Sequence, residues 1–275
     1  MPGEILFIGG GNMGRALLGG LIADGTAPER LAVADPDQPR REALARDFGM
    51  LTAARGDDLV GNAAVLVLAV KPQVLRSVAR ELAPHLGARR PLIVSIVAGI
   101  PEADIDAWLG GGFPVVRCMP NTPALVRQGI TALHANAQVD AAQRQQAQQI
   151  LAAVGAVVWV PEEAQLDAVT AVSGSGPAYF FAVMEAMEQA GRTLGLSADV
   201  ARRLTLQTAL GAAVLATQSG DPPATLRAQV TSPGGTTEAA LAVLQQGGLA
   251  ALFEQALKAA QRRAGELAET AARQA

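Results

Sequence analysis

Before Pro161, the hydrophobic pattern alternates short apolar runs with stretches of helical spacing. The runs have strand length, and several are apolar on both faces, which is typical of strands buried in a parallel sheet. A sequence that alternates strand and helix in this way predicts an α/β fold with helices on both faces of the sheet. Strands are expected over residues 5–9, 31–34, 50–52, 63–70, 92–97, 113–118 and 156–160, and helices after residue 14, over 40–48, over 74–82, from 101 and over 140–154.

After Pro161, the expected strands disappear and the chain becomes rich in Ala and Leu at helical spacing. Gly, Ser and Pro separate the helices predicted there. The sequence therefore predicts a Rossmann-type α/β domain with a parallel-rich sheet over residues 1–161, followed by an all-α domain over 162–275. These helices are expected at about 163–172, 177–194, 199–218, 223–229, 237–246 and 249–272.

The predicted helix over 199–218 carries apolar residues on more than one narrow stripe of its surface. A helix that is apolar around much of its circumference must be covered on both sides. We therefore expect the helical domain to form a homodimer.

A glycine-rich turn lies between the first expected strand and the first helix. Gly9, Gly11 and Gly14 fit the spacing G-x-G-x-x-G, and Asp35 ends the next strand. The first glycine permits a tight turn, the second lets the backbone approach a pyrophosphate, and the third lets the helix pack closely on the sheet. The helix N-terminus then offers free N–H groups and a positive dipole end to the phosphates. This pattern predicts a dinucleotide site.

The carboxyl ends of parallel strands line the ligand crevice of such a sheet. Asp35, Lys71–Pro72 and Ser95–Gly99 are therefore expected to face the cofactor. A carboxylate at Asp35 would accept hydrogen bonds from a free 2′-hydroxyl and repel a 2′-phosphate, which favours NAD (NADH) over NADP (NADPH). Arg40 or Arg41 would pair with a 2′-phosphate if the loop turned either of them inward; the alternative is that both lie on the solvent face of a helix.

Composition narrows the classes of protein that fit. The chain has 275 residues, of which 50% are hydrophobic, and a formal net charge of −3, so no basic patch predicts binding to nucleic acid or an anionic membrane. Cys118 is the only cysteine, and His85 and His134 lie in unrelated segments, so neither a disulfide nor a metal site is expected. With no basic leader and no apolar run of the roughly 18 residues that a membrane span needs, a cytoplasmic location is expected.

Two loops in the helical half place hydroxyls, glycines and a proline at helix starts, over residues 173–179 and 231–237. Glu238, just inside the second helix, is the nearest ionisable side chain. Reduction of a carbonyl usually needs a positioned Lys, His or carboxylate to move the proton. The lysines are Lys71 and Lys258, and the latter is expected to be solvated. These loops therefore favour a substrate that brings its own proton, such as a protonated imine, because hydride addition to it depends mainly on orientation.

Several stretches together resemble the pyrroline-5-carboxylate reductase family over essentially the whole chain. The resemblance implies a Rossmann domain and a helical domain that carries the substrate loop and the dimer contact. It also implies reduction of 1-pyrroline-5-carboxylate to L-proline with NAD(P)H, the final step of proline biosynthesis, and a homodimer that can be built into a larger ring of dimers. The matching stretches are residues 7–14, 69–72, 94–99, 117–123, 167–179 and 232–238.

The resemblance also assigns residues. Thr237 matches the threonine that reaches the ring nitrogen, and it is the expected catalytic residue. The alternative interpretation is that Thr237 is only the N-cap of its helix. Ser175 is expected either to line the substrate pocket or to cap a helix. The expected substrate-binding residues are Ser232, Gly234, Gly235, Thr236, Thr237 and Ser175. The expected cofactor-binding residues are Gly9, Gly11, Asn12, Met13, Gly14, Asp35, Ala69, Val70, Lys71, Pro72, Ala98, Gly99 and Asn121.

Two other functions fit the two-part architecture. A hydroxyacid dehydrogenase would need a catalytic lysine on the helix after Gly176, and residues 177–190 contain none. A nucleotide-binding module without catalysis would be expected to have lost the loop over residues 232–237, which is intact.

Overall fold

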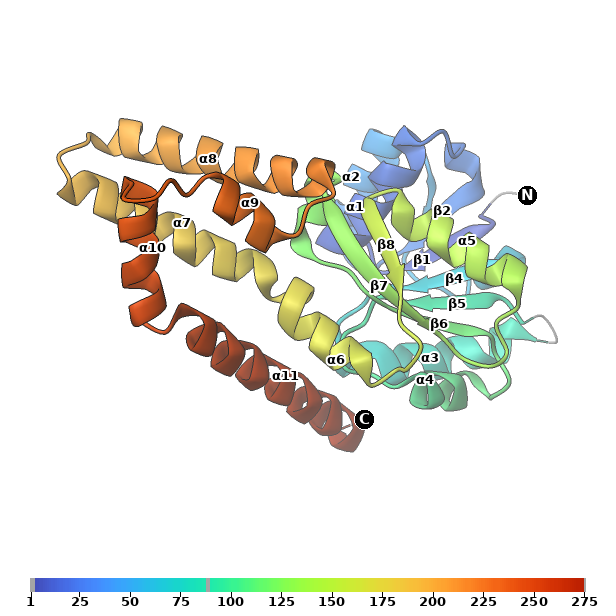
Figure 1. Cartoon of the computed structure of the whole chain (residues 1–275). Helices are drawn as coiled ribbons and strands as arrows, with labels where there is room; N and C mark the ends of the chain where they lie inside the picture. The colour runs from blue at the N-terminus through green and yellow to red at the C-terminus, as the bar shows by residue number, and fades with distance from the viewer. Residues whose placement is uncertain (1–2, 88–89, 275) are drawn as a thin grey trace. The chain divides into compact units, whose positions relative to one another are not determined.

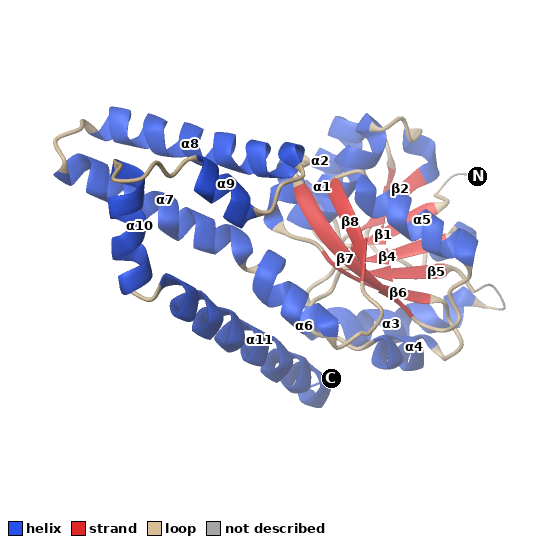
Figure 2. Ribbon diagram, in the orientation of Figure 1, coloured by secondary structure: helices blue, strands red, loops and turns tan. Residues whose placement is uncertain are grey.

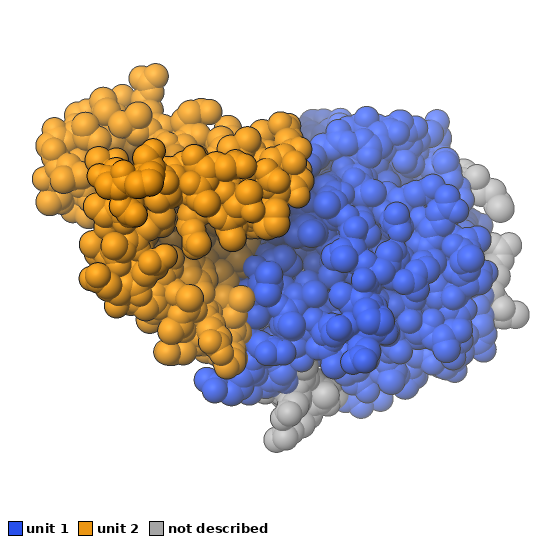
Figure 3. Space-filling model, viewed as in Figure 1, with its two compact units in different colours: residues 1–175, 260–275 blue, residues 176–259 orange. Residues whose placement is uncertain are grey.

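The computed structural model describes residues 3–87 and 90–274 of the chain (Figure 1). The ends of the predicted domains, at residues 1 and 275, lie outside the described residues. The chain forms two compact units (Figure 3). Unit 1 comprises Met1–Ser175 and Ala260–Ala275, and unit 2 comprises Gly176–Ala259.

Unit 1 is built on an eight-stranded sheet with the strand order β3-β2-β1-β4-β5-β6-β7-β8 (Figure 2). All neighbouring strands are parallel except β6 and β7, which are antiparallel. The order from β3 to β6 is that of a dinucleotide-binding Rossmann sheet, as predicted. The strands are β1 (Ile5–Ile8), β2 (Leu31–Ala34), β3 (Leu51–Ala53), β4 (Val65–Leu68), β5 (Leu92–Ser95), β6 (Val115–Met119), β7 (Gly129–Ala135) and β8 (Gly155–Trp159).

Helices cover both faces of this sheet and bury one core on each. Successive residues of a strand point to opposite faces, so Phe7 packs with Leu17 and Leu151, whereas Leu6 packs with Leu75 in the other core. The helices are α1 (Asn12–Ala23), α2 (Gln38–Phe48), α3 (Pro72–Leu86), α4 (Glu102–Leu109), α5 (Ala141–Ala152) and α6 (Gln165–Val169), with 3₁₀ turns at Pro28–Arg30, Val60–Asn62 and Thr122–Val126 and a π-helical turn at Thr170–Gly174.

Strand β7 is an element that the sequence pattern did not predict. It pairs antiparallel with β6, with Arg117 opposite His134, and parallel with β8. Its sequence contains Gly129, Thr131 and His134 among apolar residues, so it lacks the continuous apolar run that marks β1 or β4. No element was expected from the sequence between residues 123 and 140, so β7 is an addition to the predicted strands.

Unit 1 extends beyond the end of the sheet. Helix α6 and the π-helical turn contribute the buried Leu166 and Ala171, and the compact unit continues to Ser175. The boundary expected at 161/162 coincides with the loss of strands in the described chain, whereas the compact units divide further along. The functional division into residues 1–161 and 162–275 remains a prediction.

Unit 2 is helical, and its helices begin and end close to the predicted positions. They are α7 (Gly176–Thr193), α8 (Ala198–Ser219), α9 (Pro223–Gln229), α10 (Thr236–Gln246) and the first part of α11 (Leu249–Gln274). Large apolar side chains of α7 and α8 are exposed in the single chain, including Phe180, Phe181 and Leu210. An exposed apolar surface of this kind marks a face that another molecule covers. No helix in the described part of the chain is both long and apolar enough to cross a bilayer.

Candidate functional site

In the turn after β1, two of the three glycines of the G-x-G-x-x-G pattern lie so close to other backbone atoms that no side chain would fit. Gly9 has φ +102°, and a Cβ there would lie 2.6 Å from the carbonyl oxygen of Ala69. A Cβ at Gly14 would lie 2.5 Å from the carbonyl oxygen of Gly9. Both distances are too short for any side chain, so the tight turn and the close packing of α1 on the sheet require glycine at these positions.

Gly11 has a different reason to be glycine. It is the N-cap of α1 with φ −62° and ψ −173°, a conformation that any residue adopts, and a Cβ would meet no atom within 4 Å. Nothing within the chain therefore excludes a side chain at Gly11. No side chain caps α1, and its first turn has no acidic residue. The open space beside the free N–H groups of the helix fits a pyrophosphate.

A cavity of about 650 Å³ opens at this turn. It is lined by the glycine-rich turn, the end of β2, residues 54–57, the segment after β4 and one side of α3. The size suits a nucleotide-sized ligand. The predicted cofactor residues that line it are Gly9, Gly11, Asp35, Ala69, Val70 and Lys71.

Asp35 lies at the end of β2, where it is 2% exposed. Its Oδ2 accepts a hydrogen bond from Gly10 N at 2.8 Å, and its Oδ1 accepts one from Asp37 N at 2.9 Å. Arg40 Nη1 donates to both oxygens, at 3.0 and 2.9 Å. Burial by itself would raise the pKa of the Asp35 carboxyl, but the bonds from Gly10, Arg40 and Asp37 outweigh burial and hold this pKa below its ordinary value.

Both arginines considered from the sequence turn towards the end of β2. Arg40 lines the cavity and pairs with Asp35. Arg41 Nη1 instead donates to the carbonyl oxygens of Asp35 and Pro36, at 2.7 and 3.0 Å. The alternative that both side chains merely lie on the solvent face of α2 is therefore wrong.

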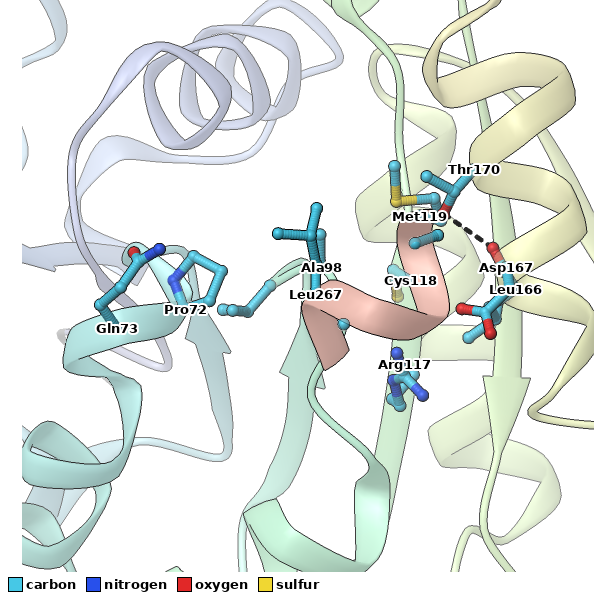
Figure 4. Close-up of a pocket in the computed structure, with 13 residues that line it drawn as sticks. Pro72, Gln73, Ala98, Arg117, Cys118, Met119, Leu166, Asp167, Thr170 and Leu267 are labelled. Carbon is cyan, nitrogen blue, oxygen red and sulfur yellow. Dashed lines mark hydrogen bonds between the residues drawn. The ribbon is translucent and has the colours of Figure 1, made fainter. Parts of the chain in front are cut away.

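A second cavity, of about 330 Å³, lies in unit 1 beyond the ends of β5 and β6 (Figure 4). Its lining includes the predicted cofactor residues Pro72, Ala98 and Gly99. Ser95, also expected to face the cofactor, is buried in β5 and does not line it. Val97, which belongs to the stretch Ser95–Gly99 expected to face the cofactor, also lines it. Further lining comes from residues with no role predicted from the sequence: Gln73, Arg117, Cys118, Met119, Leu166, Asp167, Thr170, Ala264 and Leu267.

Arg117 is the centre of a charged cluster at the edge of this second cavity. Its Nη1 donates to Glu163 Oε1 at 2.6 Å, and Glu102 N donates to the same oxygen at 2.7 Å. His134 Nε2 lies 3.5 Å from Glu102 Oε2. Burial and the charge of Glu163 raise the pKa of Glu102. Arg117 was detectable in the sequence as a charged residue within an otherwise apolar strand.

Four predicted cofactor residues are not among those that line the two cavities: Asn12, Met13, Gly14 and Asn121. Asn12 is the first, exposed residue of α1, and Met13 packs partly against the core. Asn121 has both ends of its amide engaged, because Nδ2 donates to Ser173 O at 3.2 Å and Oδ1 accepts from Ile130 N at 2.9 Å. The amide therefore joins the loop after β6 to the segment that ends at Ser175.

The predicted substrate loop lies in unit 2, before α10. Gly234 has φ +69°, and Gly235 N donates to Ser232 O at 3.0 Å, which closes a tight turn. Gly235 is the N-cap of α10, no side chain caps this helix, and Thr237 lies inside its first turn. The alternative that Thr237 is the N-cap is therefore wrong.

The acid near this loop is also engaged. Glu238 Oε2 accepts from Gly234 N at 2.7 Å, so that N–H is occupied by the chain itself. The N–H groups of Thr236 and Thr237 precede the first intrahelical bond of α10, from Ala239 N to Gly235 O. They are therefore free of intrahelical acceptors.

Other chemical groups have structural explanations. Cys118 is buried with a free thiol, and burial raises the pKa of this thiol far above its usual range. Lys258 pairs with Glu254 on the exposed side of α11, as expected of a solvated lysine. Among the described residues, no group of three or more His, Cys, Asp or Glu side chains is arranged to hold a metal ion.

The sheet order, the glycine-rich turn and the cavities define a dinucleotide-binding protein of the Rossmann type. Residues 4–99 match the family described as NADP oxidoreductase, coenzyme F420-dependent, and residues 163–267 match the pyrroline-5-carboxylate reductase dimerisation family.

Comparison over the full length is more specific. The chain is 56% identical to the pyrroline-5-carboxylate reductase of Pseudomonas aeruginosa over 97% of each chain. It is similar to the structure of the pyrroline-5-carboxylate reductase from Coxiella burnetii, with a TM-score of 0.94, 44% identity and coverage of 97% of this chain and 99% of the other. It is also similar to the Plasmodium falciparum pyrroline carboxylate reductase with NADP bound, with a TM-score of 0.83, 27% identity and coverage of 96% and 98%. The chain belongs to the pyrroline-5-carboxylate reductase family.

Proposed function

We propose that this chain reduces 1-pyrroline-5-carboxylate to L-proline with NADH or NADPH, the final step of proline biosynthesis. The observation that carries the proposal is 56% identity to a pyrroline-5-carboxylate reductase over 97% of the chain. The open space beside Gly11 adds a physical argument, because it leaves room for a pyrophosphate at the start of α1. Both alternatives, a hydroxyacid dehydrogenase and a non-catalytic module, lack a comparable observation.

The proposed cofactor site follows the ends of the parallel strands. The free N–H groups of α1 bind the pyrophosphate, and Asp35 lies at the ribose end. A reduced nicotinamide held there would supply the hydride that the C=N carbon accepts, and the C=N electron pair would move onto the ring nitrogen. The proposed cofactor residues are Gly9, Gly11, Asn12, Met13, Gly14, Asp35, Ala69, Val70, Lys71, Pro72, Ala98, Gly99 and Asn121.

The proposed substrate site is the start of α10. Because the substrate nitrogen is already protonated, the protein needs to orient the ring more than to move a proton. The uncapped N–H groups of Thr236 and Thr237 and the positive end of the helix dipole hold the carboxylate without a cationic side chain. Ser232 and the Thr236 hydroxyl assist, and the Thr237 hydroxyl accepts from the ring N–H. Gly234, Gly235 and Ser175 complete the proposed substrate-binding set.

In the proposed assembly, the chain forms a homodimer through its helical region. The match to a dimerisation family over residues 163–267 and the exposed apolar side chains of α7 and α8 support this assembly. We extend the proposal to a ring of dimers and to a cytoplasmic location, with neither nucleic acid nor a membrane as partner. Light scattering separates a dimer from a ring by molar mass.

A spectrophotometric assay tests the proposed reaction. The purified chain is mixed with NADPH or NADH and 1-pyrroline-5-carboxylate, and cofactor oxidation is followed together with the appearance of L-proline. Stoichiometric formation of both products is expected. Oxidation of hydroxyacids alone in the reverse direction would revive the dehydrogenase, and cofactor binding without turnover would favour the non-catalytic module.

A further inference from the structure

The carboxylate of Asp35, expected to bind the ribose, already accepts hydrogen bonds from its own chain at all of its acceptor positions. A carboxylate offers about four acceptor positions. Gly10 N and Asp37 N occupy one on each oxygen of Asp35, and Arg40 Nη1 lies within hydrogen-bond distance of both oxygens. A ribose hydroxyl can therefore donate to Asp35 only if it displaces one of these donors.

Of these donors, Arg40 is the one that can move. Gly10 N and Asp37 N are backbone groups, and they belong to the glycine-rich turn and the turn before α2. The Arg40 side chain is 44% exposed. In the described chain, its guanidinium hydrogen bonds all use Nη1; Nη2 lies 3.6 Å from Asp37 Oδ2 as a long ion pair. Nε and Nη2 therefore keep donors for a ligand in the cavity.

The surrounding charges do not oppose an anion at this end of the cavity. The lining contains three acids and three cations: Asp35, Asp57 and Glu81 with Arg40, Arg55 and Lys71. Two of the acids are paired, because Arg40 bonds to Asp35 and Arg55 bonds to Asp57. Arg41 adds a further positive charge at the carbonyl oxygens of the same turn. Asp35 therefore does not act as the isolated negative charge that excludes a 2′-phosphate.

We propose that Arg40, held against Asp35, admits the 2′-phosphate, so that the chain prefers NADPH to NADH. A 2′-phosphate meets the unused Arg40 donors while the pair with Asp35 stays intact. The free 2′-hydroxyl of NADH can hydrogen-bond to Asp35 only if the charge-assisted bond between Arg40 and Asp35 is broken. This inference deepens the proposed function, on whose nicotinamide cofactor it rests, and Asp35 becomes a residue that positions Arg40.

The test is a comparison of Arg40→Gln with the unchanged chain in two measurements. Steady-state kinetics give the ratio of kcat/KM for NADPH to that for NADH, and fluorescence titration without substrate gives the corresponding ratio of Kd values. Loss of one charged hydrogen-bonding group should lower the NADPH preference about tenfold or more in both measurements. The change should fall on NADPH, and Arg40→Lys should restore part of it because the charge remains.

Two matched variants show whether the effect depends on the position of Arg40 or only on the loss of one positive charge. Arg46→Gln removes one positive charge from the same helix at an exposed site paired with Asp47, and it should leave both ratios unchanged. Arg41→Gln tests the neighbouring arginine, and a larger shift there than at Arg40 would overturn the assignment. Unchanged ratios in Arg40→Gln, or an NADH preference in the unchanged chain, would overturn it as well.

Cofactor binding measured without substrate tests the role of Arg40 independently of the proposed reduction of 1-pyrroline-5-carboxylate. If the chain binds NADPH in an Arg40-dependent manner but does not turn over 1-pyrroline-5-carboxylate, the proposed function fails and the assignment of Arg40 stands. If turnover is present and Arg40→Gln leaves both ratios unchanged, the proposed function stands and the assignment fails.

Discussion

The two compact units differ in how far they bury their apolar residues within the single chain. Unit 1 sandwiches its sheet between helices and has side chains such as Leu6, Phe7 and Leu66 fully buried. In unit 2, all of whose residues the structure describes, only Gly176, Ala201 and Thr205 are buried. Unit 1 therefore stabilises itself, whereas unit 2 presents an apolar surface that needs a second copy.

The largest effect is expected in the core of unit 1. Leu66→Ala removes a side chain with 0% exposure from β4 and leaves a cavity in the core. Such a change should lower the free energy of unfolding by about 2–5 kcal/mol at every protein concentration. Leu51→Ala, at a 47% exposed position of β3, is the matched control and should change it by only about 0.5 kcal/mol. Chemical denaturation measures both, and equal effects would contradict a self-contained core.

The second effect is expected on the surface of unit 2. Leu210 in α8 is 58% exposed in the single chain. If a second copy covers it, Leu210→Asp buries a charge and should raise the dimer Kd about a hundredfold. Thr208→Asp, at an exposed position two residues away and so on the opposite side of the same helix, is the control for the added charge. Analytical ultracentrifugation that found the same Kd for both variants would place the dimer contact elsewhere.

The third effect concerns the uncapped start of α10. Thr237→Ala removes the hydroxyl proposed to reach the ring nitrogen, a bond to a charged group worth about 1.5–3 kcal/mol, or roughly ten- to a hundredfold in kcat/KM. Thr231→Ala is the matched control, because the Thr231 hydroxyl already donates to Arg227 O at 2.6 Å. Steady-state kinetics should show a loss only in the first variant. Wild-type kcat/KM with a lowered Tm in Thr237→Ala would indicate a purely structural threonine.

The smallest effect is expected from the pH dependence of Asp35. The folded chain holds the pKa of this carboxyl below its ordinary value of 3.8. The charged bonds of Asp35 therefore stabilise the fold fully above that value, and this stabilisation is lost as the pH falls through the lowered pKa. Asp35→Asn should lower the stability by about 1.5 kcal/mol at neutral pH. In thermal melts, the difference from the unchanged chain should shrink below about pH 4; a difference that did not change with pH would contradict the role of the charge.

Elements that depend on local pattern were predictable from the sequence. The four-residue apolar strands, the helices of unit 2 and the C-cap Gly49, which has φ +71°, follow from side-chain periodicity and turn chemistry. Strand β7 was missed because its own residues mix apolar and polar types and so show neither a continuous apolar run nor a helical period. The start of α10 was misplaced by one residue because glycine and threonine both serve as N-caps.

The candidate site was predictable in its residue types but not in their partners. The glycine spacing located the turn, and the cavity beside it gathers Gly9, Gly11 and Asp35. No local pattern predicts that Arg40 bonds both oxygens of Asp35, or that Arg117 pairs with Glu163 across the fold. Such ion pairs depend on rotamers and on packing between segments, which the order of residues does not reveal.

The contrast between the two units is tested most directly by diluting one protein sample until it dissociates. Molar mass, NADPH binding and turnover of 1-pyrroline-5-carboxylate are measured on the same samples across the dilution series. We expect NADPH binding to persist in the monomer, because unit 1 builds its cavity from its own residues. Turnover should fall with the fraction of dimer. A stable monomer with undiminished turnover at micromolar concentration would contradict the account.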